Sequence, residues 1–336
     1  MALMIDLTEE TMEKTRASRS SRHVPGGYIR PPLLVRLSSE IRRNWMLMLM
    51  ILPAVLYVLV FAYAPMPGII LAFKDFNYNK GIFGSPWSGL DNFKFFFVSG
   101  QFVSVIRNTV LYNMAFIVVG MVLEVGLAIV LSEMKSKTQK KILQTSIFMP
   151  YFVSWVVAAS IMLNIFGYEY GILNSILKVF GEEPINIYSS PKIWPPLLIA
   201  LKAWKATGYG TVVYLAAITG LDQQMFEAAD IDGASVWQKI RFITIPCLVP
   251  MIMLLFLLAL GSIFKGDFGL FYQVARDPQI RGITEIIDTY IYRMLVTAPN
   301  VGMSAAGGLF QSVICFIFIM TANGIVHKAA PDYALF

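Results

Sequence analysis

Long apolar runs alternate with short polar segments along most of the chain. A helix that crosses a bilayer needs about 20 mostly apolar residues, and six runs approach or exceed that length. They lie near residues 45–66, 103–131, 143–166, 193–219, 245–264 and 301–325. Their apolar residues are continuous rather than alternating, which favours helices over the strands of a transmembrane barrel. The pattern predicts an all-α membrane protein with six transmembrane helices.

The composition agrees with a membrane environment. Hydrophobic residues make up 57% of the 336 residues and charged residues 14%, whereas soluble domains carry about 25% charged residues. Cys247 and Cys315 both lie in predicted spans, so a disulfide framework is not expected. His23 and His327 lie near the two ends of the chain, which argues against a histidine-based metal site. We therefore expect neither a metal nor an organic cofactor in this chain.

Basic residues set the predicted orientation. Eight of them precede the first span: Lys14, Arg16, Arg19, Arg22, Arg30, Arg36, Arg42 and Arg43. Four more crowd the loop between the second and third spans: Lys135, Lys137, Lys140 and Lys141. Cytoplasmic loops are enriched in such residues, so both segments, and with six spans both termini, are expected in the cytoplasm. The opposite loops also carry lysines and arginines, so the bias is not absolute.

The net charge of +6 is explained by this topology and by contact with anionic lipid. Nucleic-acid binding is not expected, because the basic residues adjoin a membrane span and lack interleaved aromatic residues.

The chain divides into a tail and a transmembrane domain. Residues 1–44 form a basic cytoplasmic tail whose start is acidic and polar, without the apolar core of a secretory signal. Within it, residues 33–44 place three aliphatic side chains on one helical face, which suits an interfacial helix; a solvated basic linker explains them equally well. Residues 45–336 form the six-helix domain, with a cytoplasmic loop at 220–246.

A polar island at residues 227–246, EAADIDGASVWQKIRFITIP, interrupts the apolar pattern. Asp222 can cap a first helix, Gly233 can end it, and Ser235 can cap a second helix that stops before Pro246. The island is therefore predicted as a helix, a turn and a helix parallel to the membrane surface. On periodicity alone, an amphipathic connector resting on lipid headgroups explains it as well.

The phosphate-binding sequence GxxxxGK[ST] is absent, and the dipeptide Gly-Lys does not occur in the chain. A protein without that loop is not expected to hydrolyse nucleotide by the P-loop route. We therefore expect that the chain is not an enzyme and that, if its action is powered, the energy reaches it from another polypeptide.

The island resembles the EAA signature of the permease subunits of binding-protein-dependent ABC importers. The resemblance rests on Glu227-Ala228-Ala229, on Asp232-Gly233-Ala234, and on Ile243 and Pro246 before the penultimate span. The chain departs from the family pattern at Ile240, where Phe is usual, at Ile245, where Leu is usual, and in lacking an Ile-Pro pair before the glutamate.

The resemblance implies that the island is a coupling helix that docks on a cytoplasmic ATPase. Glu227 would make a charge-assisted contact with the ATPase, Ala228 and Ala229 would permit close approach, and Gly233 would provide the turn. The expected coupling residues are Glu227, Ala228, Ala229, Asp232, Gly233, Ala234, Ile240, Ile243 and Pro246. The implied assembly adds a second, homologous permease, two ATPases that bind ATP and Mg²⁺, and an extracytoplasmic binding protein, in the cytoplasmic membrane of a prokaryote.

Further strings are similar to carbohydrate permeases, especially those for oligosaccharides and polysaccharides. They lie at 68–78, 85–97, 214–222, 285–293 and 305–313. Sugar transport requires aromatic faces for the C–H side of a pyranose and polar groups for its hydroxyls, and polar residues at membrane depth tend to face a cavity. The expected substrate path comprises Trp155, Asn164, Lys202, Trp204, Lys205, Tyr209, Tyr214, Asp267, Phe268, Tyr272 and Gln273.

Other interpretations of these residues stay open. Trp155 and Tyr272 could be interfacial anchors, whereas Lys202 and Lys205 are stronger candidates because they lie three apart on one helical side. For Glu124 in the second span, a structural role is favoured: a hydrogen bond to a neighbouring helix or a pair with one of those lysines. For the whole chain, the alternatives to an alternating-access sugar permease are an importer of another solute and a membrane scaffold or enzyme with an amphipathic surface loop.

Overall fold

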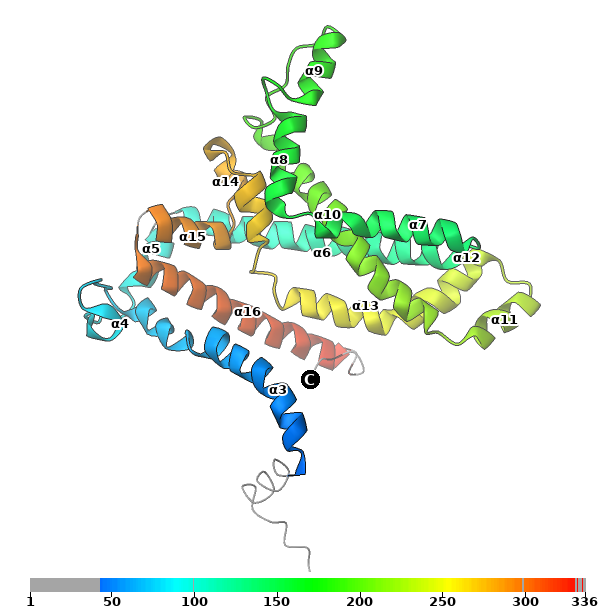
Figure 1. The fold of residues 1–336 in the computed structure, drawn as a ribbon, viewed down its shortest axis with the longest axis horizontal. Coiled ribbons are helices and arrows are strands. Elements are labelled where there is room, and N and C mark those ends of the chain that lie inside the picture. Colours follow the sequence, from blue (N-terminus) through cyan, green and yellow to red (C-terminus); the bar gives the residue numbers. More distant parts are fainter. Residues whose placement is uncertain (1–42, 99, 298, 330, 332–333, 335–336) are drawn as a thin grey trace, which may run out of the picture. The chain divides into compact units, whose positions relative to one another are not determined.

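The computed structural model describes residues 43–98, 100–297, 299–329, 331 and 334. Contacts divide the chain into one unit at Met1–Met66 and a second at Pro67–Phe336. The described secondary structure is helical (Figure 1), apart from one isolated bridge between Lys74 and Trp87. The all-α prediction is confirmed, and most of the predicted interfacial helix lies outside the described residues.

The first unit contains one described helix. Helix α3 covers Trp45–Val58 and continues as a π-helical turn, η1, at Leu59–Tyr63. No residue of either element is buried within the structure. A helix that is apolar all round and exposed over its whole described length is suited to lipid or to a neighbouring subunit.

The second unit begins with a series of short helices, where the sequence predicted a loop. After the 3₁₀ helix η2 (Met66–Phe73) come the short helices α4 (Gly81–Gly84) and α5 (Asp91–Val98). The buried Lys74 donates hydrogen bonds to the carbonyl oxygens of Ile82 and Phe83 at 3.1 and 2.7 Å. These bonds, with two from the buried Asn92 amide to Ala72 and Lys74, satisfy backbone groups that no helix satisfies.

Two long helices form the centre of this unit. Helix α6 (Gln101–Glu133) packs along α10 (Trp194–Thr219), and Figure 1 shows them side by side. Near one end they bury Leu131, Tyr214 and Leu248 in a shared core. Helix α7 (Lys137–Phe148) approaches α10 so closely at Gly208 that a Cβ there would lie 2.2 Å from the Ile147 carbonyl oxygen.

The predicted third span is not one continuous helix. Helix α7 passes into a 3₁₀ turn, η3 (Met149–Phe152), and then bends by 98° into α8 (Trp155–Phe166). Lys205 of α10 donates hydrogen bonds to the carbonyl oxygens of Tyr151, at 2.7 Å, and of Val153. The ammonium group therefore satisfies carbonyls that the break leaves without helical partners.

Beyond α8 the chain forms a hairpin around the short helix α9 (Ile172–Val179). The buried Asn174 amide bonds to the backbone of Gly167, Tyr168 and Ile185. A 3₁₀ turn, η4 (Pro191–Ile193), then leads into α10.

The C-terminal half contains the remaining long helices. Helix α11 (Gln223–Ile231) is followed by a continuous helical rod of α12 (Val236–Lys239), the π-helical turn η5 (Ile240–Thr244) and α13 (Ile245–Leu260). The last helix, α16, covers Val301–Ala329.

Between α13 and α15 lie residues 261–286, here called the cavity segment. Its first four residues were predicted as the end of the fifth span and the rest as part of the loop that follows it. It contains the π-helical turn η6 (Leu270–Val274), the 3₁₀ turn η7 (Pro278–Ile280) and helix α14 (Arg281–Thr284), and α15 follows at Ile287–Thr297. Leu270, Ile280 and Ile286 are fully buried. The segment is therefore part of the core.

Polar side chains of α6 hold this irregular segment. Asn108 donates to the carbonyl oxygens of Gly282 and Glu285, both at 3.2 Å. In the same way Tyr112 donates to Ile283 at 3.0 Å and Asn113 to Ile263 at 2.7 Å, and Thr109 accepts from the Ile287 N–H at 2.9 Å. Helix α6 thus supplies the hydrogen bonds that the segment cannot make with itself.

The predicted count of six spans is not confirmed. Within the described residues, four helical stretches have the length and apolarity of a span: Trp45–Phe73, Gln101–Glu133, Val236–Leu260 and Val301–Lys328. The bent pair α7–α8 would be a fifth. Helix α10 has 26 residues but is not among them, because its two lysines, glycines and threonines interrupt the apolar sequence.

Candidate functional site

The coupling loop, residues 220–246, begins with a helix fixed by its own side chains. The Asp222 carboxylate accepts a hydrogen bond from the Gln224 N–H at 2.9 Å at the start of α11. At the end of α11 the Ala234 N–H donates to the Ala229 carbonyl at 2.9 Å, and the Gly233 N–H donates to Asp230 at 3.1 Å. These two bonds form a Schellman motif.

Gly233 is the turn residue of the loop. Its φ is +75°, in the left-handed region that residues other than Gly, Asn and Asp rarely adopt. A Cβ built at this position meets no atom within 4 Å, so the requirement for glycine is conformational. The predicted turn is confirmed.

The second part of the loop starts as predicted but does not stop as predicted. Ser235 and Gln238 form a capping box, with the Ser235 N–H donating to Gln238 Oε1 at 2.7 Å. The helix then continues through η5 into α13, with Pro246 in the first turn of α13. A proline inside a helix removes one backbone hydrogen bond, and here it follows directly on the π-helical turn η5, so Pro246 does not end the helix.

Most predicted coupling residues face outward. Glu227, Ala228, Asp232, Gly233 and Pro246 are exposed, Ala229, Ala234 and Ile243 are half-buried, and Ile240 is buried. The loop also exposes large apolar side chains, above all Ile231 at 87% and Trp237 at 79%. The arrangement presents an apolar surface with acidic residues beside it, while Ile240 anchors the loop to its own chain.

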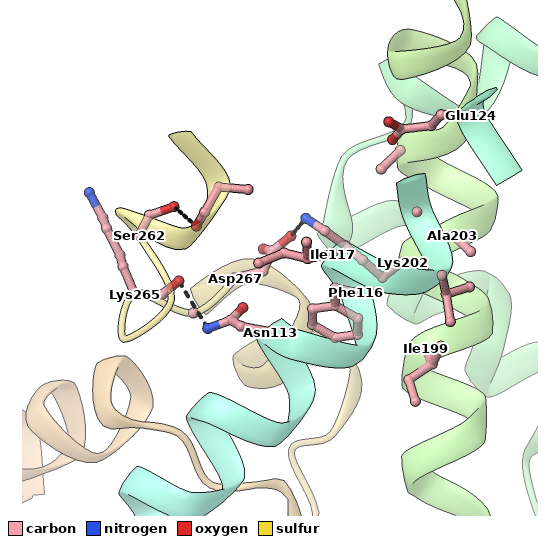
Figure 2. A pocket seen from close by; sticks show the side chains of 15 residues that line it. Asn113, Phe116, Ile117, Glu124, Ile199, Lys202, Ala203, Ser262, Lys265 and Asp267 are labelled. Carbon is pink, nitrogen blue, oxygen red and sulfur yellow. Dashed lines mark hydrogen bonds and ion pairs between the residues drawn. The ribbon is translucent and has the colours of Figure 1, made fainter. Parts of the chain in front are cut away.

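A cavity of about 440 Å³, here called the central cavity, lies between α6, α10 and the start of the cavity segment. Figure 2 shows Lys202 and Asp267 pointing toward each other across it. The Lys202 ammonium lies 2.7 Å from Asp267 Oδ2, and the Trp155 indole N–H donates to the same oxygen at 3.1 Å. Asp267 Oδ1 accepts from the Leu270 N–H at 3.2 Å. Asp267 thus joins three elements: α8, α10 and the cavity segment.

Glu124 lines the same cavity, apart from the Lys202–Asp267 pair (Figure 2). A Cβ at Gly210 of α10 would lie 2.0 Å from the Glu124 carboxyl carbon, so the glycine makes room for this side chain. Among the described residues no ion pair joins Glu124 to a lysine. With Lys202 and Lys265 opposing Glu124 and Asp267, the cavity carries equal numbers of positive and negative groups.

A second cavity of about 480 Å³, here called the arginine cavity, lies within the C-terminal end of the cavity segment and α15. Tyr272 and Gln273, two residues of the predicted substrate path, line it. Tyr272 stacks on Phe268 with ring centroids 4.9 Å apart, and Tyr292 of α15 meets both rings edge-on at 5.0 Å.

The structure brings some predicted path residues together and leaves others apart. Lys202 and Asp267 line the central cavity, whereas Lys205 is engaged at the helix break. Tyr214 is only 1% exposed and belongs to the core between α6, α10 and α13, where it contributes to packing.

Three other predicted path residues line neither cavity. Tyr209 stacks on Tyr151 at 5.0 Å. Trp204 is 46% exposed, and the exposed Asn164 donates to Ser160 of its own helix at 2.9 Å.

Several cavity-lining residues were missed from the sequence. They are Asn113, Phe116, Ser262, Arg276, Arg281, Glu285, Tyr292 and Arg293. A signal was present for some of them, because Glu285, Tyr292 and Arg293 recur at helical spacing within EIIDTYIYR. The remaining residues of this list are brought to the cavities only by tertiary packing, which leaves no pattern in the sequence.

Comparisons with known proteins agree with this arrangement. The sequence profile of the family described as binding-protein-dependent transport system inner membrane component matches residues 124–328. The chain is 34% identical over 290 residues to Protein LplB of Bacillus subtilis (strain 168), covering 86% of this chain and 91% of that protein. It is 33% identical to the polygalacturonan/rhamnogalacturonan transport system permease protein YteP of the same organism, covering 88% and 92%.

A solved structure shows the same fold. A chain of a bacterial ABC transporter involved in the import of the acidic polysaccharide alginate matches with a TM-score of 0.78 and 32% identity, covering 88% of this chain and 99% of that chain. A related structure contains that transporter in complex with a periplasmic protein bound to an alginate pentasaccharide, and its match has a TM-score of 0.77 and 31% identity. This chain belongs to the family of binding-protein-dependent transport system inner membrane components.

Proposed function

We propose that the chain is the permease subunit of an ATP-driven importer that moves an oligosaccharide or polysaccharide across the cytoplasmic membrane by alternating access. The observation that carries the proposal is the outward-facing coupling loop, whose large apolar side chains Ile231 and Trp237 are 87% and 79% exposed. Exposed apolar surface of this kind is typical of a protein interface. The partner would be a cytoplasmic ATPase that holds ATP and Mg²⁺.

The helical rod from Val236 to Leu260 gives the loop a mechanical connection to the interior. Closure of two ATPases would displace the coupling loop, and α13 would carry the displacement to Ser262 at the central cavity. A helix transmits such a movement because its backbone hydrogen bonds make it stiff along its axis. The cavity would then open alternately to the two sides of the membrane.

In this proposal the chain crosses the membrane six times, with both termini in the cytoplasm. The candidate spans would be completed by the bent pair α7–α8 and by α10, whose lysines are covered by Asp267 and by backbone carbonyls. A second, homologous permease would close the path from the other side, and an extracytoplasmic binding protein would deliver the substrate.

A carbohydrate substrate is supported by the chemistry of the cavities and by the relatives. The aromatic group of Phe268, Tyr272 and Tyr292 offers ring faces for pyranose C–H groups. Gln273 and the arginines beside it offer donors for hydroxyl groups. Two of the similar proteins are described by polysaccharide substrates: YteP is a polygalacturonan/rhamnogalacturonan transport system permease protein, and the solved transporter is involved in the import of alginate.

The test is import by the complete complex. The chain is co-expressed with its neighbouring permease, ATPase and binding-protein genes, reconstituted in liposomes, and supplied with radiolabelled oligosaccharides or amino acids. Uptake of a saccharide that requires ATP and the binding protein supports the proposal. Uptake of amino acids without saccharide uptake would overturn the substrate class, and uptake without the ATPase would overturn the mechanism.

A further inference from the structure

The arginine cavity has a pronounced excess of positive charge. Arg276, Arg281 and Arg293 line it, and Glu285 is the carboxylate that faces them there. The Glu285 carboxylate is held by Arg293, with Nη2 and Oε1 2.6 Å apart. Within the described residues, neither Arg276 nor Arg281 forms an ion pair. In the described part of the chain, two guanidinium groups therefore line this cavity without an ion pair of their own.

The single carboxylate compensates little of this charge. Burial raises the pKa of the Glu285 carboxyl, while Arg293 and Arg281 act in the opposite direction. Because this carboxylate is paired with Arg293, it leaves Arg276 and Arg281 without a matching negative charge in the cavity. The central cavity, by contrast, contains two lysines and two acidic residues.

The wall of the cavity also continues into another hollow. An adjoining cavity of about 410 Å³ shares Arg281, Glu285 and Arg293 with the arginine cavity. The shared residues place guanidinium groups along both spaces rather than at one point. Guanidinium groups distributed over two adjoining cavities suit a ligand with repeated anionic groups.

The rim of the arginine cavity adds ring faces. Tyr272 and Tyr292 line the cavity and pack against Phe268, which lies outside it. Guanidinium groups bind carboxylates through two parallel hydrogen bonds, and aromatic rings contact the C–H face of a sugar. An acidic saccharide combines both features, because it carries carboxylates and presents C–H faces.

We propose that the arginine cavity binds the carboxylate groups of an acidic saccharide, a chain of uronate residues, on its way to the central cavity. This inference rests on the proposed function and narrows its substrate class. Arg276 and Arg281 are the carboxylate-binding residues, and Tyr272 and Tyr292 flank the sugar ring. The Glu285–Arg293 pair positions Arg293 between the two cavities.

The test compares two probes that differ only in charge. Trigalacturonate and its carboxyl-reduced counterpart are titrated calorimetrically into the complete complex in nanodiscs of zwitterionic lipid, without binding protein. Wild type is expected to bind trigalacturonate at least tenfold more tightly. Arg276→Gln and Arg281→Gln should each weaken trigalacturonate binding about tenfold, the usual effect of losing one charge-assisted hydrogen bond, and should leave the reduced probe unaffected.

Arg107→Gln is the matched control, because Arg107 is an exposed arginine of α6 that lines neither cavity. It should bind both probes as wild type does, and unchanged unfolding temperatures would show that the cavity variants are folded. Equal affinity for the two probes, or unchanged trigalacturonate binding in Arg281→Gln, would overturn the inference. A repeat in phosphatidylglycerol nanodiscs tests whether the cavity binds a lipid headgroup instead. If the anionic lipid abolishes the arginine-dependent binding of trigalacturonate, the inference is overturned.

The inference and the proposed function can fail separately. Import of a neutral oligosaccharide with no effect of the arginine variants would refute the acidic substrate and leave carbohydrate import standing. Amino acid import without saccharide import would refute both.

Discussion

The coupling loop and the cavity segment are held by opposite kinds of contact. In the coupling loop, the hydrogen bonds of Asp222 and Ser235 reach two or three residues along the chain. In the cavity segment, the carbonyls of Gly282 and Ile263 accept bonds from α6, whose residues are 174 and 150 positions away. The loop is therefore self-contained and exposed, whereas the segment depends on a distant helix.

This difference assigns different tasks to the two regions. A self-capped loop can move as a unit without losing its own hydrogen bonds, which suits an element that receives force. A segment whose backbone is satisfied by α6 changes shape when α6 or α13 moves, which suits the wall of a cavity that must open and close. Substitutions in the coupling loop should thus impair coupling to the ATPase. Substitutions of the α6 residues that bond to the cavity segment should lower the stability of the fold.

The largest expected effect comes from Gly233→Trp. A residue with a Cβ at a φ of +75° costs about 1–2 kcal/mol, and the indole would also obstruct the docking surface. ATP-dependent uptake should fall about a hundredfold, equal to about 2.7 kcal/mol of lost coupling, and co-purification of the ATPase should be lost. Gly233→Asn is the matched control, because Asn tolerates the left-handed region. Uptake above half the wild-type rate in Gly233→Trp would contradict the assignment.

The second effect tests the dependence of the cavity segment on α6. Asn108→Leu leaves the carbonyls of Gly282 and Glu285 without this donor, and each unmet buried bond costs about 1–3 kcal/mol. The unfolding temperature in detergent should fall by several degrees. Asn164→Leu is the control, since its exposed amide bonds only to its own helix. Equal shifts in both variants would show that the segment does not need α6.

Sequence alone revealed the loop because its determinants are local. Asp222, Gly233 and Ser235 each act within a few residues of their position, so pattern and propensity suffice to place them. The π-helical turn at Ile240–Thr244 escaped prediction, because it carries no local mark and lets the helix pass through the place where Pro246 was expected to end it.

The interior was less predictable because its determinants are distant in sequence. The bend between α7 and α8 depends on Lys205 of α10 and on the close approach at Gly208. Tyr214 was assigned to the path for its polar group, yet the packing of three helices buries it in the core. Lys202 and Asp267 were both proposed from their chemistry, but their contact could not be, since 65 residues separate them.

A third prediction asks whether Lys205 is structural or binds substrate. Lys205→Met removes the donor for two carbonyls at the helix break and should lower the free energy of unfolding by about 1–2 kcal/mol. Lys205→Arg keeps the donors and should restore most of it. Thermal unfolding gives the stability, and uptake kinetics give KM. A raised KM with unchanged stability would instead show a substrate contact.

The smallest effect is expected from the ion pair that joins the two helices of the coupling loop. Lys239 Nζ lies 2.7 Å from Asp230 Oδ1, but the aspartate side chain is 59% exposed. Exposed pairs contribute about 0–1 kcal/mol because water screens them and the side chains lose rotamer freedom. A double-mutant cycle of Lys239→Met and Asp230→Asn, followed by unfolding in low and high salt, should yield less than about 1 kcal/mol, and less still in high salt. A salt-independent value well above 1 kcal/mol would mean that the pair, rather than the caps at Asp222 and Ser235, holds the loop together, and the contrast with the cavity segment would then weaken.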